Sequence, residues 1–300
     1  DAEFAAYLRE KVTFPWTMID KITPRPDPRV AEMLRQDGFE DTELIITARK
    51  TYTAAFVNAE EKEYLVIEDN FPNGRPPLEA AGIYFAGRET VSNVERMKVT
   101  TCLNPLHTAL AVFGCVMGYE TICAEMGDPL LKKLVERIGY VEGLPVVVSP
   151  GIIDPKTFID EVINERLPNV FLPDTPQRIA TDTSQKLAIR FGETIKAHVA
   201  RGDVDALVGI PLALAGWFKY LSGVGDDGAP FALSPDPRLP LFAEPLTAEN
   251  AGRLIPPVLR DTSIFGLDLE EAGLANRVLA YAQDMLAGTA RAVLERELKD

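Results

Sequence analysis

One segment combines side-chain types that carbonyl–alcohol chemistry uses. Between Glu95 and His107 it places the amine of Lys98, the amide of Asn104 and the imidazole of His107 where a long apolar stretch begins. A lysine exchanges a proton with a reacting oxygen when burial lowers its pKa, and an amide polarises that oxygen without carrying charge. The alternative, favoured by spacing alone, is a surface lysine, a helix-capping asparagine followed by Pro105, and a core histidine.

The spacing of Lys98, Asn104 and His107 along the chain predicts an irregular backbone between them. In a regular helix, nine residues at about 100° each place Lys98 opposite His107, whereas Asn104 and His107 share a face. The β-branched stretch from Val99 to Thr101 is weakly helical, and Pro105 suits a helix start. We therefore predict a break or a π-type bulge between Lys98 and Asn104.

Two further segments carry charge in a pattern that suits a polar ligand. Asp20 lies in an apolar extended stretch, where it can accept hydrogen bonds from a polyhydroxylated ligand or simply pair with Lys21 or Arg25. Basic side chains recur at Arg178, Lys186 and Arg190, so a single helix would gather them on one side and suit a carboxylate substrate. The alternative for this stripe is a solvated helix face with an internal acidic partner.

Composition and length limit the class of protein. The 300 residues are 46% hydrophobic, and 31 basic against 45 acidic residues give a net charge of −14. Such an acidic chain disfavours nucleic acid and an anionic membrane as partners. Two histidines exclude a histidine-rich metal site, and a carboxylate-based one has no support in the sequence, so we expect no metal. Three cysteines without CxxC spacing favour a cytoplasmic protein.

The pattern of apolar residues predicts two parts. Residues 1–90 read as mixed α/β, with strands over 43–57 and 63–68, and residues 91–300 read as helical. Helices are expected over the following ranges: 3–11, 30–37, 103–126, 129–139, 155–166, 179–201, 204–221 and 267–298, the last with a possible break. The expected fold is mainly α with a small α/β N-terminal portion. A glycine-rich GxGxxG turn after a strand does not occur in the sequence.

Several stretches resemble motifs of the mannitol dehydrogenase family, the long-chain polyol dehydrogenases that include fructuronate reductase. They are VTFPWTMIDKITP (12–24), VIEDNFPNGRP (66–76), residues 95–107, DTSQKL (182–187), and GWFKY with the following GVG (216–225). The family spaces its lysine and asparagine one residue closer than Lys98 and Asn104. The resemblance implies a helical C-terminal domain of the 6-phosphogluconate dehydrogenase type after a dinucleotide-binding domain, of which residues 1–90 are a remnant or extension.

The same resemblance implies an NAD-dependent oxidoreductase that interconverts a keto-sugar acid or ketose with its hydroxy form, such as fructuronate and mannonate. Lys98 matches the catalytic lysine, Asn104 the amide that holds the carbonyl, His107 a substrate-binding group, and Glu95 a proton-exchanging glutamate. Asp20 and Lys186 match positions near the substrate, where Arg178 and Arg190 are also expected. NAD would be held mainly by a nucleotide-binding core outside this chain. The alternative is a non-catalytic helical binding or oligomerisation module.

Overall fold

The computed structural model describes residues 1–21, 25–59, 64–172 and 174–299. Its backbone contacts divide into two compact units. The smaller unit comprises Asp1–Met97 with Val148–Asp154, and the larger comprises Lys98–Val147 with Pro155–Asp300.

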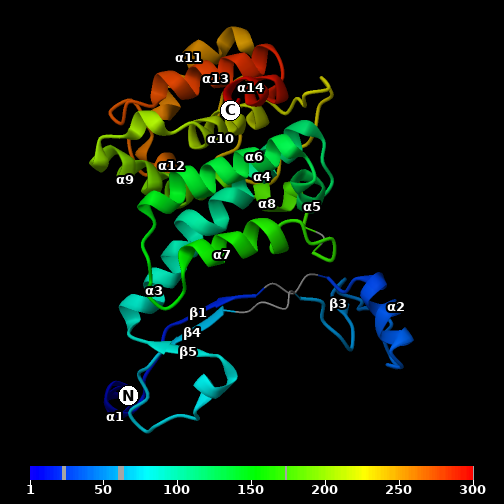
Figure 1. Ribbon diagram of the computed structural model, residues 1–300, viewed down its shortest axis with the longest axis vertical. Coiled ribbons are helices and arrows are strands. Elements are labelled where there is room, and N and C mark those ends of the chain that lie inside the picture. The colour runs from blue at the N-terminus through cyan, green and yellow to red at the C-terminus, as the bar shows by residue number, and fades with distance from the viewer. Residues whose placement is uncertain (22–24, 60–63, 173, 300) are drawn as a thin grey trace. The chain divides into compact units, whose positions relative to one another are not determined.

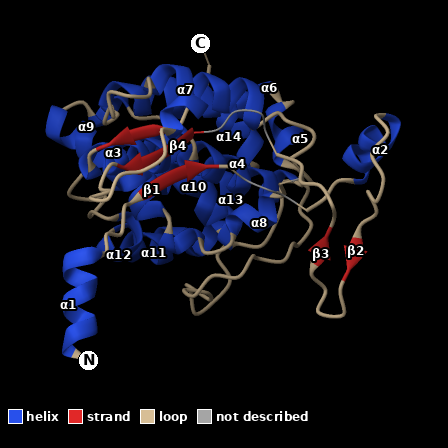
Figure 2. Ribbon diagram, turned by 90° about the horizontal axis from the view of Figure 1, so that it is seen from below, coloured by secondary structure: helices blue, strands red, loops and turns tan. Residues whose placement is uncertain are grey.

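The smaller unit is built on a three-stranded sheet of β1 (Thr17–Asp20), β4 (Tyr64–Glu68) and β5 (Tyr84–Ala86). The central strand β4 runs antiparallel to β1 and parallel to β5, and Met18 lies opposite Val66. Helix α3 (Arg88–Met97) packs against β1 and β4, and its apolar residues recur at three-residue steps at Val91, Val94 and Met97. Figure 2 shows the strands of this sheet side by side.

The expected strand over 43–57 is wrong, because a tight loop divides it. The structure has two short antiparallel strands, β2 (Ile45–Ile46) and β3 (Tyr52–Thr53), joined where Lys50 adopts a φ of 60°. The helices predicted near the N-terminus are confirmed as α1 (Ala2–Lys11) and α2 (Pro28–Gln36). Part of the motif over 12–24 lies outside the described residues.

The larger unit is helical, which confirms the predicted helix-rich fold with few strands. Helices α4, α10 and α13 form its centre, since α10 packs against both of the others (Figure 1). Its α-helices are α4 (Asn104–Met117), α5 (Ile122–Met126), α6 (Pro129–Glu136), α7 (Pro155–Glu161), α8 (Pro176–Ala180), α9 (Glu193–Arg201), α10 (Gly209–Leu221), α11 (Ala248–Leu259), α12 (Thr262–Phe265), α13 (Ala275–Ala287) and α14 (Ala290–Glu297).

Four of the predicted helices are interrupted. The helix expected over 204–221 begins as a 3₁₀ turn, Val204–Ala206, which the extended Leu207 separates from α10. The helix expected over 103–126 ends at Gly118, whose φ of 77° stops α4 before α5 begins. The helix expected over 179–201 is broken at Asp182, which has a φ of 54°, and resumes as the π-helical turn Ala188–Gly192 that continues into α9. The possible break expected within 267–298 is confirmed, because Gly288 separates α13 from α14.

The helical stretch Arg88–Met117 is long and apolar enough to span a membrane by length and composition. Within the described residues it is the stretch that meets this test, but 83% of its apolar window is buried in the structure. Burial of this extent is what the core helix of a globular domain shows.

The start of the central helix α10 depends on one buried carboxylate, that of Glu142. Its oxygens accept the backbone N–H groups of Val208, Gly209 and Ile210 at 2.7–2.9 Å. The Arg137 guanidinium donates to the same carboxylate at 3.0 Å. Because the first N–H groups of a helix lack partners within it, Glu142 satisfies donors that would otherwise be buried without hydrogen bonds.

Replacing Glu142 with alanine is expected to lower the free energy of unfolding by about 3 kcal/mol, because buried N–H groups and Arg137 lose their acceptor. Urea denaturation of the Glu142→Ala variant measures this loss. Glu142→Gln keeps an acceptor and is expected to lose less. The exposed Glu295→Ala on α14 is the control, with a change within about 0.5 kcal/mol. Equal midpoints for Glu142→Ala and the control would contradict this role.

Candidate functional site

The backbone between Lys98 and Asn104 is irregular, as predicted. Lys98–Cys102 is a π-helical turn, and the Leu103 N–H donates to the Lys98 carbonyl five residues back at 3.1 Å. Leu103 then leaves helical geometry, with φ −130° and ψ −62°, and α4 begins at Asn104. Regular i→i−4 bonding resumes where the His107 N–H donates to the Leu103 carbonyl. This turn changes the phase that would place Lys98 opposite His107 in a regular helix.

Lys98 and Asn104 are both half-buried at this junction. The Asn104 carbonyl accepts the Thr108 hydroxyl at 2.8 Å, one turn further along α4. The same hydroxyl accepts a hydrogen bond from the guanidinium of Arg190. The first turn of α4 is therefore linked by hydrogen bonds to Arg190, which belongs to a second π-helical turn, Ala188–Gly192.

His107 faces an acidic partner that the sequence analysis missed. Its Nε2 lies 3.6 Å from Oδ2 of Asp174, and Asp174 forms an ion pair with Arg178. Burial lowers the pKa of His107 to about 4. The nearby arginines lower this pKa further, and the negative charge of Asp174 raises it by less than burial lowers it. The imidazole is therefore neutral at pH 7. The nearest sequence signal was the helix-start pattern Asp-Thr-Pro at 174–176.

Lys186 and Arg190 supply positive charge close to each other. The Lys186 ammonium donates to the backbone carbonyls of Ile179 and Thr181. The pKa of Lys186 is lowered mainly by burial and, to a smaller extent, by the positive charge of Arg190. Burial also lowers the pKa of Arg190, to about 10. Within the described part of the chain neither side chain makes an ion pair.

The prediction of one basic stripe on a single helix is wrong. Arg178 lies on α8, Lys186 follows a 3₁₀ turn at Thr183–Gln185, and Arg190 lies in the π-helical turn Ala188–Gly192. The chain folds back at Asp182, and the Asp236 carboxylate fixes the 3₁₀ turn by accepting the N–H and hydroxyl of Ser184. Folding, rather than helical periodicity, brings Arg178 and Arg190 near His107, and Lys186 near both arginines.

Two predicted site residues belong to the smaller unit. Glu95 is exposed on α3, and Asp20 is the last residue of β1, paired with Tyr64. The side chain of Asp20 lies outside the described residues. A shared site of Asp20 or Glu95 with Lys98 and His107 stays a prediction.

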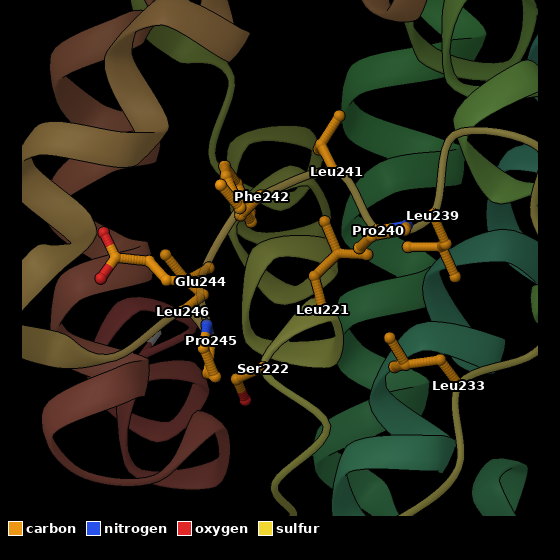
Figure 3. A pocket seen from close by; sticks show the side chains of 11 residues that line it. Leu221, Ser222, Leu233, Leu239, Pro240, Leu241, Phe242, Glu244, Pro245 and Leu246 are labelled. Carbon is orange, nitrogen blue, oxygen red and sulfur yellow. The ribbon is translucent and has the colours of Figure 1, made fainter.

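A cavity of about 380 Å³ lies in the larger unit, and its lining does not include these residues. The chain segment 239–246 and the end of α10 line it, and the labelled side chains in Figure 3 are mostly leucine, proline and phenylalanine. Its one carboxylate, Glu244, pairs with Arg253. The carboxylate that the lining offers is therefore already held in an ion pair. In the described ranges, moreover, no three His, Cys, Asp or Glu side chains gather to hold a metal ion.

The depressed pKa of His107 has a measurable consequence. Between pH 6.5 and about 4 the unfolded chain protonates this residue and the folded chain does not, so stability falls as the pH drops through that window. NMR titration is expected to show one histidine ring signal with an inflection near pH 4, and this signal is absent in His107→Gln. The variant is expected to lose less stability than the wild type across the window. An inflection of the His107 signal near 6.5 would contradict the burial argument.

Comparison with known proteins places the chain in a family. The family model described as the mannitol dehydrogenase C-terminal domain matches residues 90–286, and that of the mannitol dehydrogenase Rossmann domain matches residues 1–80. A D-mannonate oxidoreductase of Thermotoga maritima is 52% identical, over 96% of this chain and 55% of its own. One of Escherichia coli is 30% identical, over 97% and 56%.

A solved structure of a mannitol dehydrogenase also matches this chain. The ternary complex of Pseudomonas fluorescens mannitol 2-dehydrogenase with NAD and D-mannitol matches with a TM-score of 0.75 at 25% identity, over 100% of this chain and 57% of that one. The chain thus spans about half the length of the relatives it matches. Since one family model alone covers more than half of its residues, the chain belongs to the mannitol dehydrogenase family.

Proposed function

We propose that this chain supplies the substrate-binding and proton-transfer part of an NAD-dependent oxidoreductase that interconverts a keto-sugar acid or ketose with its hydroxy form, such as fructuronate and mannonate. The observation that carries the proposal is the cluster in the larger unit, where a neutral His107 lies near Arg178 and Arg190, and Lys186 lies near the same two arginines. The names of the D-mannonate oxidoreductases and the mannitol 2-dehydrogenase support the same reaction class.

The charge of the cluster suits an anionic substrate. Asp174 compensates Arg178, and Lys186 is held by two neutral carbonyls and attracted by the carboxylates of Asp182 and Asp236. Arg190 is held by the neutral hydroxyl of Thr108 and forms no ion pair within the described residues, so its positive charge is available to a ligand. A guanidinium or an ammonium in a partly buried setting forms strong charge-assisted hydrogen bonds to a carboxylate or to sugar hydroxyls.

The proposed roles follow from the chemistry of each group. In oxidation, the Lys98 amine takes the proton of the substrate hydroxyl, and in reduction its ammonium returns that proton to the carbonyl oxygen. The Asn104 amide donates to the reacting oxygen, and neutral His107 orients a neighbouring hydroxyl. Asp20 would accept hydrogen bonds from the substrate, and Glu95 would exchange the proton with solvent.

NAD supplies the hydride acceptor, and NADH the donor, when bound. The described residues of the smaller unit do not fit a dinucleotide site by themselves. The parallel strands β4 and β5 are joined by a loop with one 3₁₀ turn, Leu78–Ala81, and carry no glycine-rich turn leading into a helix. The proposed steps therefore concern only the substrate side. We also propose that the helical unit has the fold of the C-terminal domain of 6-phosphogluconate dehydrogenase. The protein is proposed to be cytoplasmic, where its three free cysteine thiols would stay reduced.

Lys98→Ala in the full protein is expected to lower kcat by about 10²–10⁴-fold, because proton transfer to the reacting oxygen is lost. NADH binding, followed by fluorescence titration, is expected to persist. Initial rates of NADH oxidation with fructuronate, tagaturonate and fructose measure turnover and rank the substrates. Lys196→Ala, on the exposed face of α9 and paired with Glu193, is the matched control. Wild-type kcat in Lys98→Ala would remove Lys98 from the mechanism, and no turnover of any of the three by the wild type would refute the reaction class.

A further inference from the structure

The backbone carbonyl of Thr100 lies within the π-helical turn Lys98–Cys102, before the helical ladder is interrupted at Leu103. A hydrogen bond to a buried backbone carbonyl stabilises the conformation that presents it.

Thr194 of α9 makes such a bond. Its hydroxyl donates to the Thr100 carbonyl at 3.1 Å, and the two residues are 94 positions apart in the chain. Thr194 is 5% exposed, so water does not compete freely for this bond. A helical threonine commonly bonds to a carbonyl of its own helix, whereas this hydroxyl reaches a different element.

Close packing restrains both the π-helical turn Lys98–Cys102 and the start of α9, which carries Thr194. A Cβ on Gly192, just before α9, would lie 2.2 Å from the Phe265 carbonyl oxygen, so the backbone there is held against its neighbour. A Cβ on Gly143 would lie 2.8 Å from the Thr101 methyl group, so another segment presses on the turn itself. Thr194 therefore approaches Thr100 from a backbone that has little room to shift.

We propose that Thr194 is a positioning residue for Lys98. The hydroxyl holds the Thr100 carbonyl and so keeps the five-residue turn that sets the direction of Lys98 relative to Asn104 and His107. This inference rests on the proposed proton-transfer role of Lys98. Thr194 touches neither substrate nor cofactor in this account, and it acts only through the backbone of the turn.

The test compares two substitutions at one position. Thr194→Val keeps the shape and removes the hydroxyl, and Thr194→Ser keeps the hydroxyl and removes a methyl group. Thr194→Val in the full protein is expected to lower kcat by about tenfold to a hundredfold, the range for a misplaced catalytic group. KM for the sugar acid is expected to stay near the wild-type value, since the cations that bind it are not moved. Thr194→Ser is expected to restore most of kcat.

Controls separate this inference from the proposed function. Ser222→Ala removes a comparable hydroxyl-to-carbonyl bond at the end of α10 and is expected to keep wild-type kcat. If Lys98→Ala abolishes turnover while Thr194→Val retains wild-type kcat, Thr194 has no positioning role. If Val and Ser lower kcat alike, or kcat falls only with a matching fall in Tm and rise in KM, the inference is also overturned. Wild-type turnover in Lys98→Ala would instead refute the proposed function.

Discussion

The geometry of the candidate site depends on one backbone constraint, the π-helical turn between Lys98 and Cys102. A regular helix through Lys98 and His107 would direct the two side chains to opposite sides. The i→i−5 bond from Leu103 to Lys98 and the non-helical Leu103 interrupt that ladder before α4 starts. Pro105, placed in the first turn of α4, makes the start of this helix compatible with the irregular turn before it.

The rest of the larger unit gives this turn a rigid setting. Almost every residue of α4 after Asn104 is buried, and α10 packs along it from a start that Glu142 fixes. A second π-helical turn carries Arg190, whose guanidinium reaches back to Thr108 on α4. Side chains that are far apart in sequence thus converge on the first turns of one buried helix, where burial keeps His107 neutral beside cationic neighbours.

The sequence predicted the features that depend on local chemistry. The β-branched stretch and Pro105 indicated the irregular turn, and the glycine at 288 agrees with the expected break near the C-terminus. The predictions from sequence were wrong where the backbone conformation of a single residue changed the direction of the chain. The left-handed conformation of Asp182 converts an apparent basic stripe into a fold-back, and Lys50 converts one expected strand into a hairpin. Asp174 and Thr194 were missed because their roles arise from contacts across 67 and 94 residues, which periodicity does not encode.

The central claim is that Lys98 and the first turn of α4 serve one reacting oxygen. A crystal structure of the full protein with a sugar acid and the oxidised cofactor tests it most directly. The account predicts Lys98 Nζ and the Asn104 amide nitrogen each within hydrogen-bond distance, about 2.7–3.2 Å, of the same substrate oxygen. A substrate bound with its reacting oxygen on other groups, and with Lys98 directed away from it, would contradict the account.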